Sequence, residues 1–189
     1  MKLYEYKSYE EYVEAQTEAN KRKLNLVWVK EETLKKVKRY ANNASIILCH
    51  GTRNGAEQMI FKSLYPNADK VMGTEISETA NKFPYTLHHD FHKVLPDFVG
   101  QCDIVYSNAF DHSFDPDLCM SVWSDQVKPH GYMFLERMVG DDNRSKASDP
   151  LEISRQELID LAGKHGLFFV NNEPAGGRIG QSELLVFKK

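Results

Sequence analysis

The sequence contains few cysteines and no long apolar run, and both shortages restrict the kind of protein it encodes. Its three cysteines, Cys49, Cys102 and Cys119, are odd in number, far apart and never spaced as C-x-x-C. This spacing disfavours a disulfide scaffold and a structural zinc site, so we expect reduced, mostly buried thiols. No apolar segment approaches the roughly 20 residues that span a bilayer, and the N-terminus lacks the apolar stretch of a signal peptide. These features favour a cytoplasmic protein without membrane association.

The chain also lacks the basic excess that is typical of proteins whose whole surface binds nucleic acid. Its formal net charge is -3 over 189 residues. The length fits one domain, residues 1–189, with a sizeable core. One local stretch, residues 21–39, contains eight Lys or Arg and only two acidic residues. We interpret this stretch as the solvated face of two helices, with an anionic substrate or an RNA backbone as the alternative.

Hydrophobic patterning predicts an α/β fold. Residues 9–23 and 30–41 are expected to form helices, joined by the short apolar segment 24–29, and residues 1–44 together form an N-terminal helical cap. From residue 45 the pattern alternates between strands and helices, which indicates a mostly parallel sheet covered on both faces. Strands are expected at residues 45–49, 70–74, 86–89, 103–107, 132–136, 167–171 and 183–187, and helices at 56–64, 115–127 and 154–165.

The last two predicted strands are joined by residues 172–182, which are too few and too rich in turn residues for a crossover helix. These strands should therefore pair antiparallel. Ser154 and Glu157 have capping-box spacing at the start of the preceding helix. The prediction for residues 45–189 is a Rossmann-like three-layer sandwich whose seven-stranded sheet is mostly parallel, with the last strand antiparallel.

The stretch "CHGTRNGAEQ", residues 49–58, is a turn between a strand and a helix. It carries Gly51 and Gly55, but Arg53 stands where a dinucleotide-binding turn has its middle glycine. A pyrophosphate would need the backbone to approach closely there, so a dinucleotide fits poorly. A nucleoside with a free carboxylate would instead give the arginine a partner. S-adenosylmethionine is such a ligand, whereas an ordinary tight turn is the alternative.

Polar residues also follow the next three predicted strands. Glu75 ends the second strand, where a carboxylate can accept both hydroxyl groups of a ribose. Asp90 follows the third strand, in a position to accept from an adenine amino group, and Phe91 stands beside it to contact the ring. After the fourth strand comes the segment 108–112, "NAFDH". The order of these groups along the chain favours a nucleoside site, although each alone has a structural explanation.

Residues 45–136 resemble class I S-adenosylmethionine-dependent methyltransferases. The segment "VKPHGY" is similar to the family's "LKPGG" turn, with Pro129 and Gly131 kept and His130 in place of the first glycine. The segment "DHSFDP" resembles the "EHxxDP" of many members that methylate small molecules. The chain departs from the family at Cys49, where an acidic residue commonly precedes the glycines, and at Arg53.

The resemblance implies S-adenosylmethionine as cofactor and assigns four groups of residues to it. The methionine end is assigned to Gly51, Thr52, Arg53 and Gly55, the ribose to Glu75 and Ile76, the adenine to Asp90 and Phe91, and the sulfonium end of the pocket to Asn108, Ala109 and Phe110.

Methyl transfer from a sulfonium is an in-line displacement in which a base is optional. We name His112 as the candidate base because its ordinary pKa suits proton abstraction at neutral pH, with Asp111 as an orienting or alternative carboxylate. Packing over the cofactor or capping of the next helix is the alternative role of His112. Trp28 and Tyr132 are candidates for a substrate wall or for the core.

Several other interpretations stay open. His88, Asp90 and His92 alternate as metal ligands on one side of a strand would, but we assign no metal because Asp90 already has a role. The segment "SNAF" resembles the motif of methyltransferases that act on adenine, yet both prolines of that motif are missing. The glycines of "AGGRIG", residues 175–180, suit a hairpin loop better than an anion cradle. Residues 140–150 form a polar loop after a strand end, where open α/β sheets place their sites.

The sequence does not specify the methyl acceptor or the oligomeric state. A small-molecule substrate is favoured by the "DHSFDP" resemblance and by the acidic net charge. An RNA or other macromolecular substrate, and a cofactor-binding module without catalysis, are the alternatives.

Overall fold

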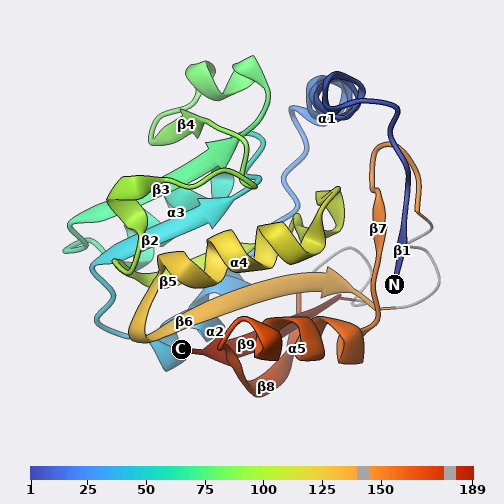
Figure 1. Ribbon diagram of the computed structural model, residues 1–189. Helices are drawn as coiled ribbons and strands as arrows, with labels where there is room; N and C mark the ends of the chain where they lie inside the picture. Colours follow the sequence, from blue (N-terminus) through green and yellow to red (C-terminus); the bar gives the residue numbers. More distant parts are fainter. Residues whose placement is uncertain (140–144, 177–181) are drawn as a thin grey trace.

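A seven-stranded sheet forms the centre of the computed structural model (Figure 1), which describes residues 1–139, 145–176 and 182–189. The spatial order of the strands is β4-β3-β2-β5-β6-β9-β8. Their bounds are β2 Ile46–His50, β3 Lys70–Glu75, β4 Thr86–His88, β5 Cys102–Ser107, β6 Val127–Met138, β8 Phe168–Ala175 and β9 Ser182–Lys188. From β4 to β6 all neighbours are parallel, whereas β9 is antiparallel to both β6 and β8. The predicted sheet, including its antiparallel last strand, is therefore confirmed.

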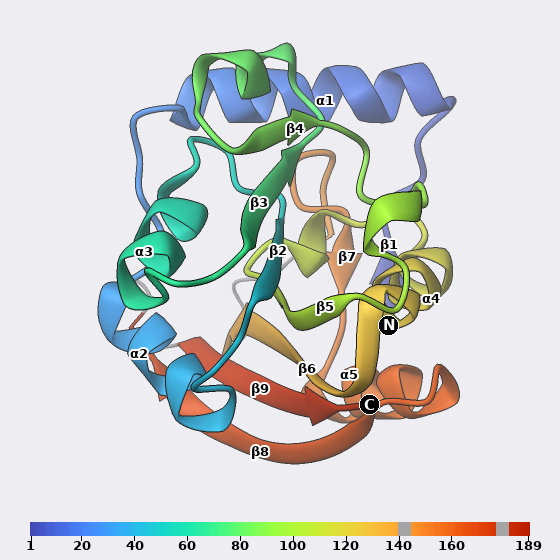
Figure 2. The same ribbon diagram turned by 90° about the vertical axis from the view of Figure 1, so that its left-hand side faces the viewer.

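Helices cover both faces of the sheet (Figure 2). One face is covered by α2 (Glu31–Tyr40) and α3 (Ala56–Leu64), and the other by α4 (Pro116–Gln126) and α5 (Arg155–Lys164). Successive residues of β2 point to opposite sides, so Ile47 and Cys49 pack with the α2 and α3 side chains, while Leu48 packs with those of α4. Burial on both faces explains why β2, with the sequence IILCH, is a nearly continuous apolar run.

The helix α1 (Tyr9–Lys23) lies across the end of the sheet near β3 and β4 (Figure 2). The Ser8 side chain caps its first turn by accepting from the backbone N–H of Glu11. The strand β1 (Lys2–Leu3), which precedes α1 in the chain, pairs antiparallel with β7 (Leu151–Glu152). Nothing in the sequence pattern indicated this two-stranded sheet, because strands of two residues are too short to show any periodicity.

Several predicted boundaries move by a few residues. The strand β6 begins at Val127, directly after α4, so the "VKPHGY" segment belongs to the strand; His130 within it has a φ of 66°. The strand β4 ends at His88 rather than at residue 89. The predicted capping box of α5 is present, since Ser154 and Glu157 each accept from the other's backbone N–H.

Short 3-10 helices complete the fold at η1 Glu78–Lys82, η2 Pro96–Phe98 and η3 Phe110–His112. All three cysteines are free and buried, as predicted. Among the described residues, none of the helices has the length and apolar character needed to cross a bilayer. Residues 140–144 of the polar loop and 177–180 of the "AGGRIG" segment lie outside the described residues.

Candidate functional site

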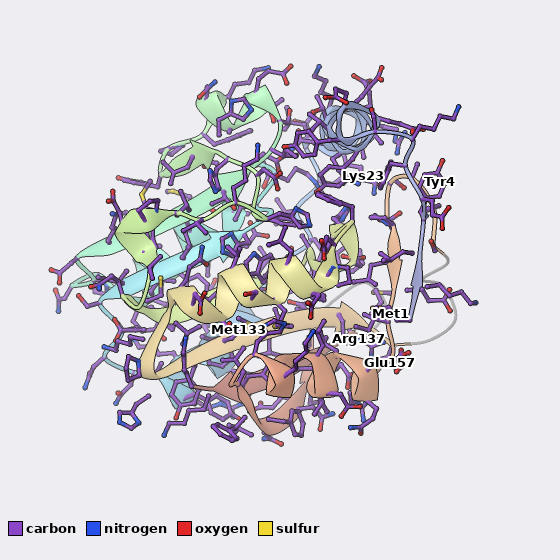
Figure 3. All side chains as sticks on the ribbon, in the orientation of Figure 1. Met1, Tyr4, Lys23, Met133, Arg137 and Glu157 are labelled. Atoms are coloured by element: carbon purple, nitrogen blue, oxygen red, sulfur yellow. The ribbon has the colours of Figure 1, made fainter. Side chains whose placement is uncertain are left out.

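A cavity of about 520 Å³ lies at the carboxyl ends of the parallel strands. Both candidate catalytic residues and nine of the eleven predicted cofactor residues line it; Thr52 and Gly55 do not. The helix α1, part of the predicted N-terminal cap, contributes one wall; its residues Tyr12, Gln16, Ala19, Asn20 and Lys23 were not named from the sequence. Further lining residues include Trp28, Glu136, Arg137, Lys146 and Asp149; Lys23 and Arg137 are labelled in Figure 3. Cavities of this size hold small organic ligands.

The turn after β2 is built around Gly51. Its φ is +70°, and a Cβ added there would lie 2.5 Å from the Cβ of Ala109, so only glycine fits. Thr52 is buried beneath the turn, where its N–H donates to the Thr74 carbonyl and its hydroxyl accepts from Gln58. Gly55 is the N-cap of α3 in a left-handed conformation. Thr52 and Gly55 therefore shape the turn without facing the cavity.

Arg53 spans from the turn to the segment between α1 and α2. Its φ is 44°, its backbone N–H donates to Oε2 of Glu75 at 3.0 Å, and its Nη1 donates to the Leu26 carbonyl at 3.1 Å. The Nη1 group of the guanidinium thus binds the protein, although the residue also lines the cavity. A guanidinium has five N–H donors, so others stay available for a ligand.

Glu75 lies at the end of β3 with 7% of its surface exposed. Its Oε2 accepts from Arg53 and its Oε1 accepts from the backbone N–H of Ser77 at 2.9 Å. Burial raises the pKa of Glu75 above its usual value, against the opposing effects of the Ser77 N–H, the Asn20 amide and the Arg53 N–H. Each carboxylate oxygen has two lone pairs, so each retains one that the two backbone bonds do not use.

Asp90 accepts more hydrogen bonds from the protein than the sequence indicated. Its Oδ1 accepts from the backbone N–H and from Nδ1 of His92, and its Oδ2 accepts from the Tyr9 hydroxyl at 2.8 Å. Burial alone would raise its pKa, but the bonds from His92 and Tyr9 outweigh burial and lower the pKa to about 2. Phe91 packs against Trp123 and lies beneath Gly51.

The alternative metal site at His88, Asp90 and His92 does not form. The His88 ring donates to the Ile76 carbonyl, whereas the His92 ring lies between Asp90 and Ser113. The strand ends at His88, so the three side chains no longer share one side of an extended segment.

His112 lies instead in a different cluster, with Asp111 and with Asp149 from the loop before β7. Its Nε2 is 3.9 Å from Oδ1 of Asp111 and 3.8 Å from Oδ1 of Asp149. Its Nδ1 is 2.8 Å from Oε1 of Gln16, whose amide nitrogen donates to the Ala147 carbonyl. A Gln oxygen only accepts, so this network places a proton on Nδ1 and turns Nε2 towards the two carboxylates.

Burial raises the pKa of Asp111. For Asp149 burial is outweighed by His112, Ser148 and Lys146, which lower its pKa. The ligand atoms of Asp111, His112 and Asp149 lie within 4.8 Å of one another, a grouping that could hold a cation or a ligand donor. The sequence marked the loop that contains Asp149 but not the residue itself.

Sequence reasoning also missed Gln16 and Asn20. Together with Tyr12 and Ala19 they form the buried face of α1. Their helical spacing was visible in the sequence, but polar side chains at these positions resemble a solvated surface. Only the neighbouring strand ends make them part of a site.

No family model and no curated protein matches the sequence. Solved structures do match it. They include the Burkholderia thailandensis 1,6-didemethyltoxoflavin-N1-methyltransferase with bound S-adenosylhomocysteine, at a TM-score of 0.73 and 10% identity over 98% of this chain and 92% of that chain. A chain of the complex between the Haloferax volcanii Trm112 methyltransferase activator and the putative methyltransferase matches with a TM-score of 0.69 and 14% identity, over 95% and 97% of the two chains.

The chain has the class I methyltransferase fold. The methyltransferase fold also occurs in the [4+2]-cyclase SpnF, which matches with a TM-score of 0.67 and 11% identity over 95% of this chain and 93% of that one. Identities this low establish the fold alone, so activity has to be argued from the site.

Proposed function

We propose that this protein is an S-adenosylmethionine-dependent methyltransferase that acts on a small metabolite. The observation that carries the proposal is the convergence of the Gly51 turn, Glu75, Asp90 and Asn108 on one cavity. These groups follow four different strands, so their meeting is independent of any single motif. The bound cofactor would supply an electrophilic methyl group, which passes to the acceptor as the carbon–sulfur bond breaks.

On the donor side, the residues suit a nucleoside that carries an amino acid. Glu75 has unused lone pairs for ribose hydroxyls, and Gly51, which has no side chain, brings the turn close to Ala109 at the cavity. Arg53 has spare N–H donors for a carboxylate. Asp90 retains one lone pair on Oδ2 for an adenine amino group, since Tyr9 and His92 use the others.

On the acceptor side, His112 is the candidate base, with Asp111 and Asp149 beside it. The Nε2 atom of His112 faces the two carboxylates, and Gln16 holds the opposite ring nitrogen. A proton released by the acceptor would move to Nε2, and the carboxylates would stabilise the resulting imidazolium. Asp149 could thus share the orienting role that we assigned to Asp111.

A small acceptor is supported by the position of the basic stretch. Lys35 pairs with Glu31 and Glu32, and Arg39 pairs with Glu173. These partners belong to α2 and β8, and they do not line the cavity; of the eight Lys and Arg in the stretch, Lys23 alone does. The stretch therefore suits solvated helix faces better than an RNA track that leads to the site. An RNA substrate predicts steeply salt-dependent binding, so RNA affinity that is flat with salt would count against it.

Calorimetry with S-adenosylmethionine and S-adenosylhomocysteine tests the proposal directly. We expect binding of both ligands, and the absence of binding at high micromolar ligand would overturn it. The variant Arg53→Gly then tests the donor side, because unchanged affinity would remove the arginine from the carboxylate site.

A cofactor-binding protein without methyl transfer is the second candidate, because the same fold occurs in a protein named as a cyclase. Transfer of a labelled methyl group to any member of a metabolite mixture would exclude this second candidate. Binding of the cofactor without any transfer would favour it over the first.

A further inference from the structure

Asn20 of α1 contributes a buried amide to the cavity wall. The residue is 6% exposed and lines the cavity. Its Oδ1 accepts a hydrogen bond from the Thr79 hydroxyl at 2.8 Å. With the Thr79 hydroxyl donating to Oδ1, the other end of the amide, Nδ2, is turned away from Thr79.

The amide nitrogen of Asn20 has no acceptor among the described residues. Nδ2 makes no hydrogen bond within this part of the chain, although the Asn20 amide lies close enough to Glu75 to lower the pKa of that carboxyl. Buried N–H groups are rarely left unpaired, because desolvation is unfavourable when no acceptor replaces water. A donor of this kind in a cavity wall is explained by an acceptor on the ligand.

Beside this donor, Glu75 offers acceptors. Its two oxygens each take one backbone N–H, from Arg53 and from Ser77, and each keeps one lone pair. The wall therefore presents one N–H and two acceptor sites side by side. An ammonium group could not accept from Asn20, and a carboxylate could not donate to Glu75. A pair of neighbouring hydroxyl groups does both, because each hydroxyl donates and accepts.

We propose that Asn20 donates a hydrogen bond to a ribose hydroxyl oxygen of the bound nucleoside while Glu75 accepts the hydroxyl hydrogens. This inference rests on the proposed function for the identity of the nucleoside. By this inference α1 is a part of the site for the methyl donor rather than only a cap over the sheet.

A consequence for the acceptor side follows from the spacing along α1. Gln16 lies one turn before Asn20, on the same buried face, and holds Nδ1 of His112. A nucleoside that binds Asn20 would hold α1 against the sheet and, with it, the amide that orients His112.

The test measures the affinity of S-adenosylhomocysteine and of its 2′-deoxy and 3′-deoxy analogues by calorimetry, in the full chain and in Asn20→Leu. Wild type should bind the parent ligand about 10-fold more tightly than at least one deoxy analogue, the size of one hydrogen bond to a buried partner. In Asn20→Leu the parent affinity should fall about 10-fold, and part of the preference for that hydroxyl should disappear. Lys21→Ala is the matched control, because Lys21 is the next residue of α1 and forms an exposed pair with Glu78; its hydroxyl preference should match wild type.

Three results would overturn the inference. They are a wild type that binds the parent and both analogues equally, an Asn20→Leu variant that weakens all three ligands by the same factor, and an Asn20→Leu variant with unchanged affinity. The second result would mean that Asn20 only supports the fold. Failure of wild type to bind S-adenosylhomocysteine at all would instead overturn the proposed function.

Should Asn20→Leu not fold, Thr79→Val replaces it. This variant keeps the amide but removes the hydroxyl that orients it. The preference for the hydroxyl should decrease, and an undiminished preference would overturn the inference.

Discussion

Replacing Gly51 by alanine would test the turn that lines the cavity after β2. Two separate penalties apply at this position. The φ of +70° is strained for any residue with a Cβ, at about 1–2 kcal/mol. In addition, the new Cβ would lie 2.5 Å from the Cβ of Ala109, so the two backbones would have to separate. Crowding of this kind typically costs about 1–3 kcal/mol, which gives a total of roughly 2–5 kcal/mol of lost stability.

Two other glycines separate these contributions. Gly166 has a φ of +77° with no heavy atom within 4 Å of an added Cβ, so Gly166→Ala measures the backbone strain alone, about 1–2 kcal/mol. Gly163 lies in α5 with open space around it, and Gly163→Ala should stabilise the protein by about 0.5–1 kcal/mol because glycine is a poor helix former.

Urea denaturation of the three variants gives the free energies of unfolding. The expected order of stability is Gly163→Ala above wild type, then Gly166→Ala, then Gly51→Ala. The Gly51 variant should also bind S-adenosylhomocysteine more weakly, because the shifted turn lines the cavity. Equal destabilisation by Gly51→Ala and Gly166→Ala would refute the contact with Ala109, and with it the close approach of the turn to the end of β5.

Three further predictions concern buried ionisable groups. The pKa of Asp90 is lowered to about 2, so its stabilising contribution is complete above the ordinary pKa near 4 and is lost as the pH falls towards 2; the stability difference between wild type and Asp90→Asn should shrink by about 2 kcal/mol over that range. Burial lowers the pKa of His50 to about 3, so the unfolded chain binds a proton below about pH 6.5 that the folded chain does not. Stability should fall between pH 6.5 and 3 for this reason, and an NMR titration of His50 with a midpoint above pH 5 would contradict it. Glu75→Ala should weaken cofactor binding by about 1.5–3 kcal/mol and also destabilise the turn in denaturation, because it removes the acceptor of the Arg53 and Ser77 N–H groups; unchanged stability would contradict the second effect.

The local sequence pattern was enough to predict the strands of the seven-stranded sheet and the helices that cover it. The strands and the helices around them follow from apolar runs and from helical spacing, which are properties of neighbouring residues. The helix at residues 9–23 has the bounds Tyr9–Lys23 in the structure. The small β1–β7 sheet could not be predicted, because its two strands pair across about 150 residues with no periodicity of their own.

The candidate site also contains some residues that could be predicted from the sequence and others that could not. Gly51, Glu75, Asp90 and Asn108 could be named from the sequence, because the carboxyl ends of parallel strands always meet at one edge of the sheet. Gln16, Asn20 and Asp149 could not, since their positions depend on how α1 and the loop before β7 fold over that edge. The same packing decided that Asp90 binds His92 and Tyr9, and that Arg53 reaches the Leu26 carbonyl.

The sequence by itself therefore determined the sheet, its antiparallel last strand and the strand-end residues of the site, because these depend on short-range periodicity and on the rules of parallel sheets. Only the tertiary structure decided which polar groups from the N-terminal helix and from the later loop complete the cavity. Contacts of this kind join residues that are far apart in the chain. No local pattern predicts which polar side chains will be buried and will therefore require a hydrogen-bond partner.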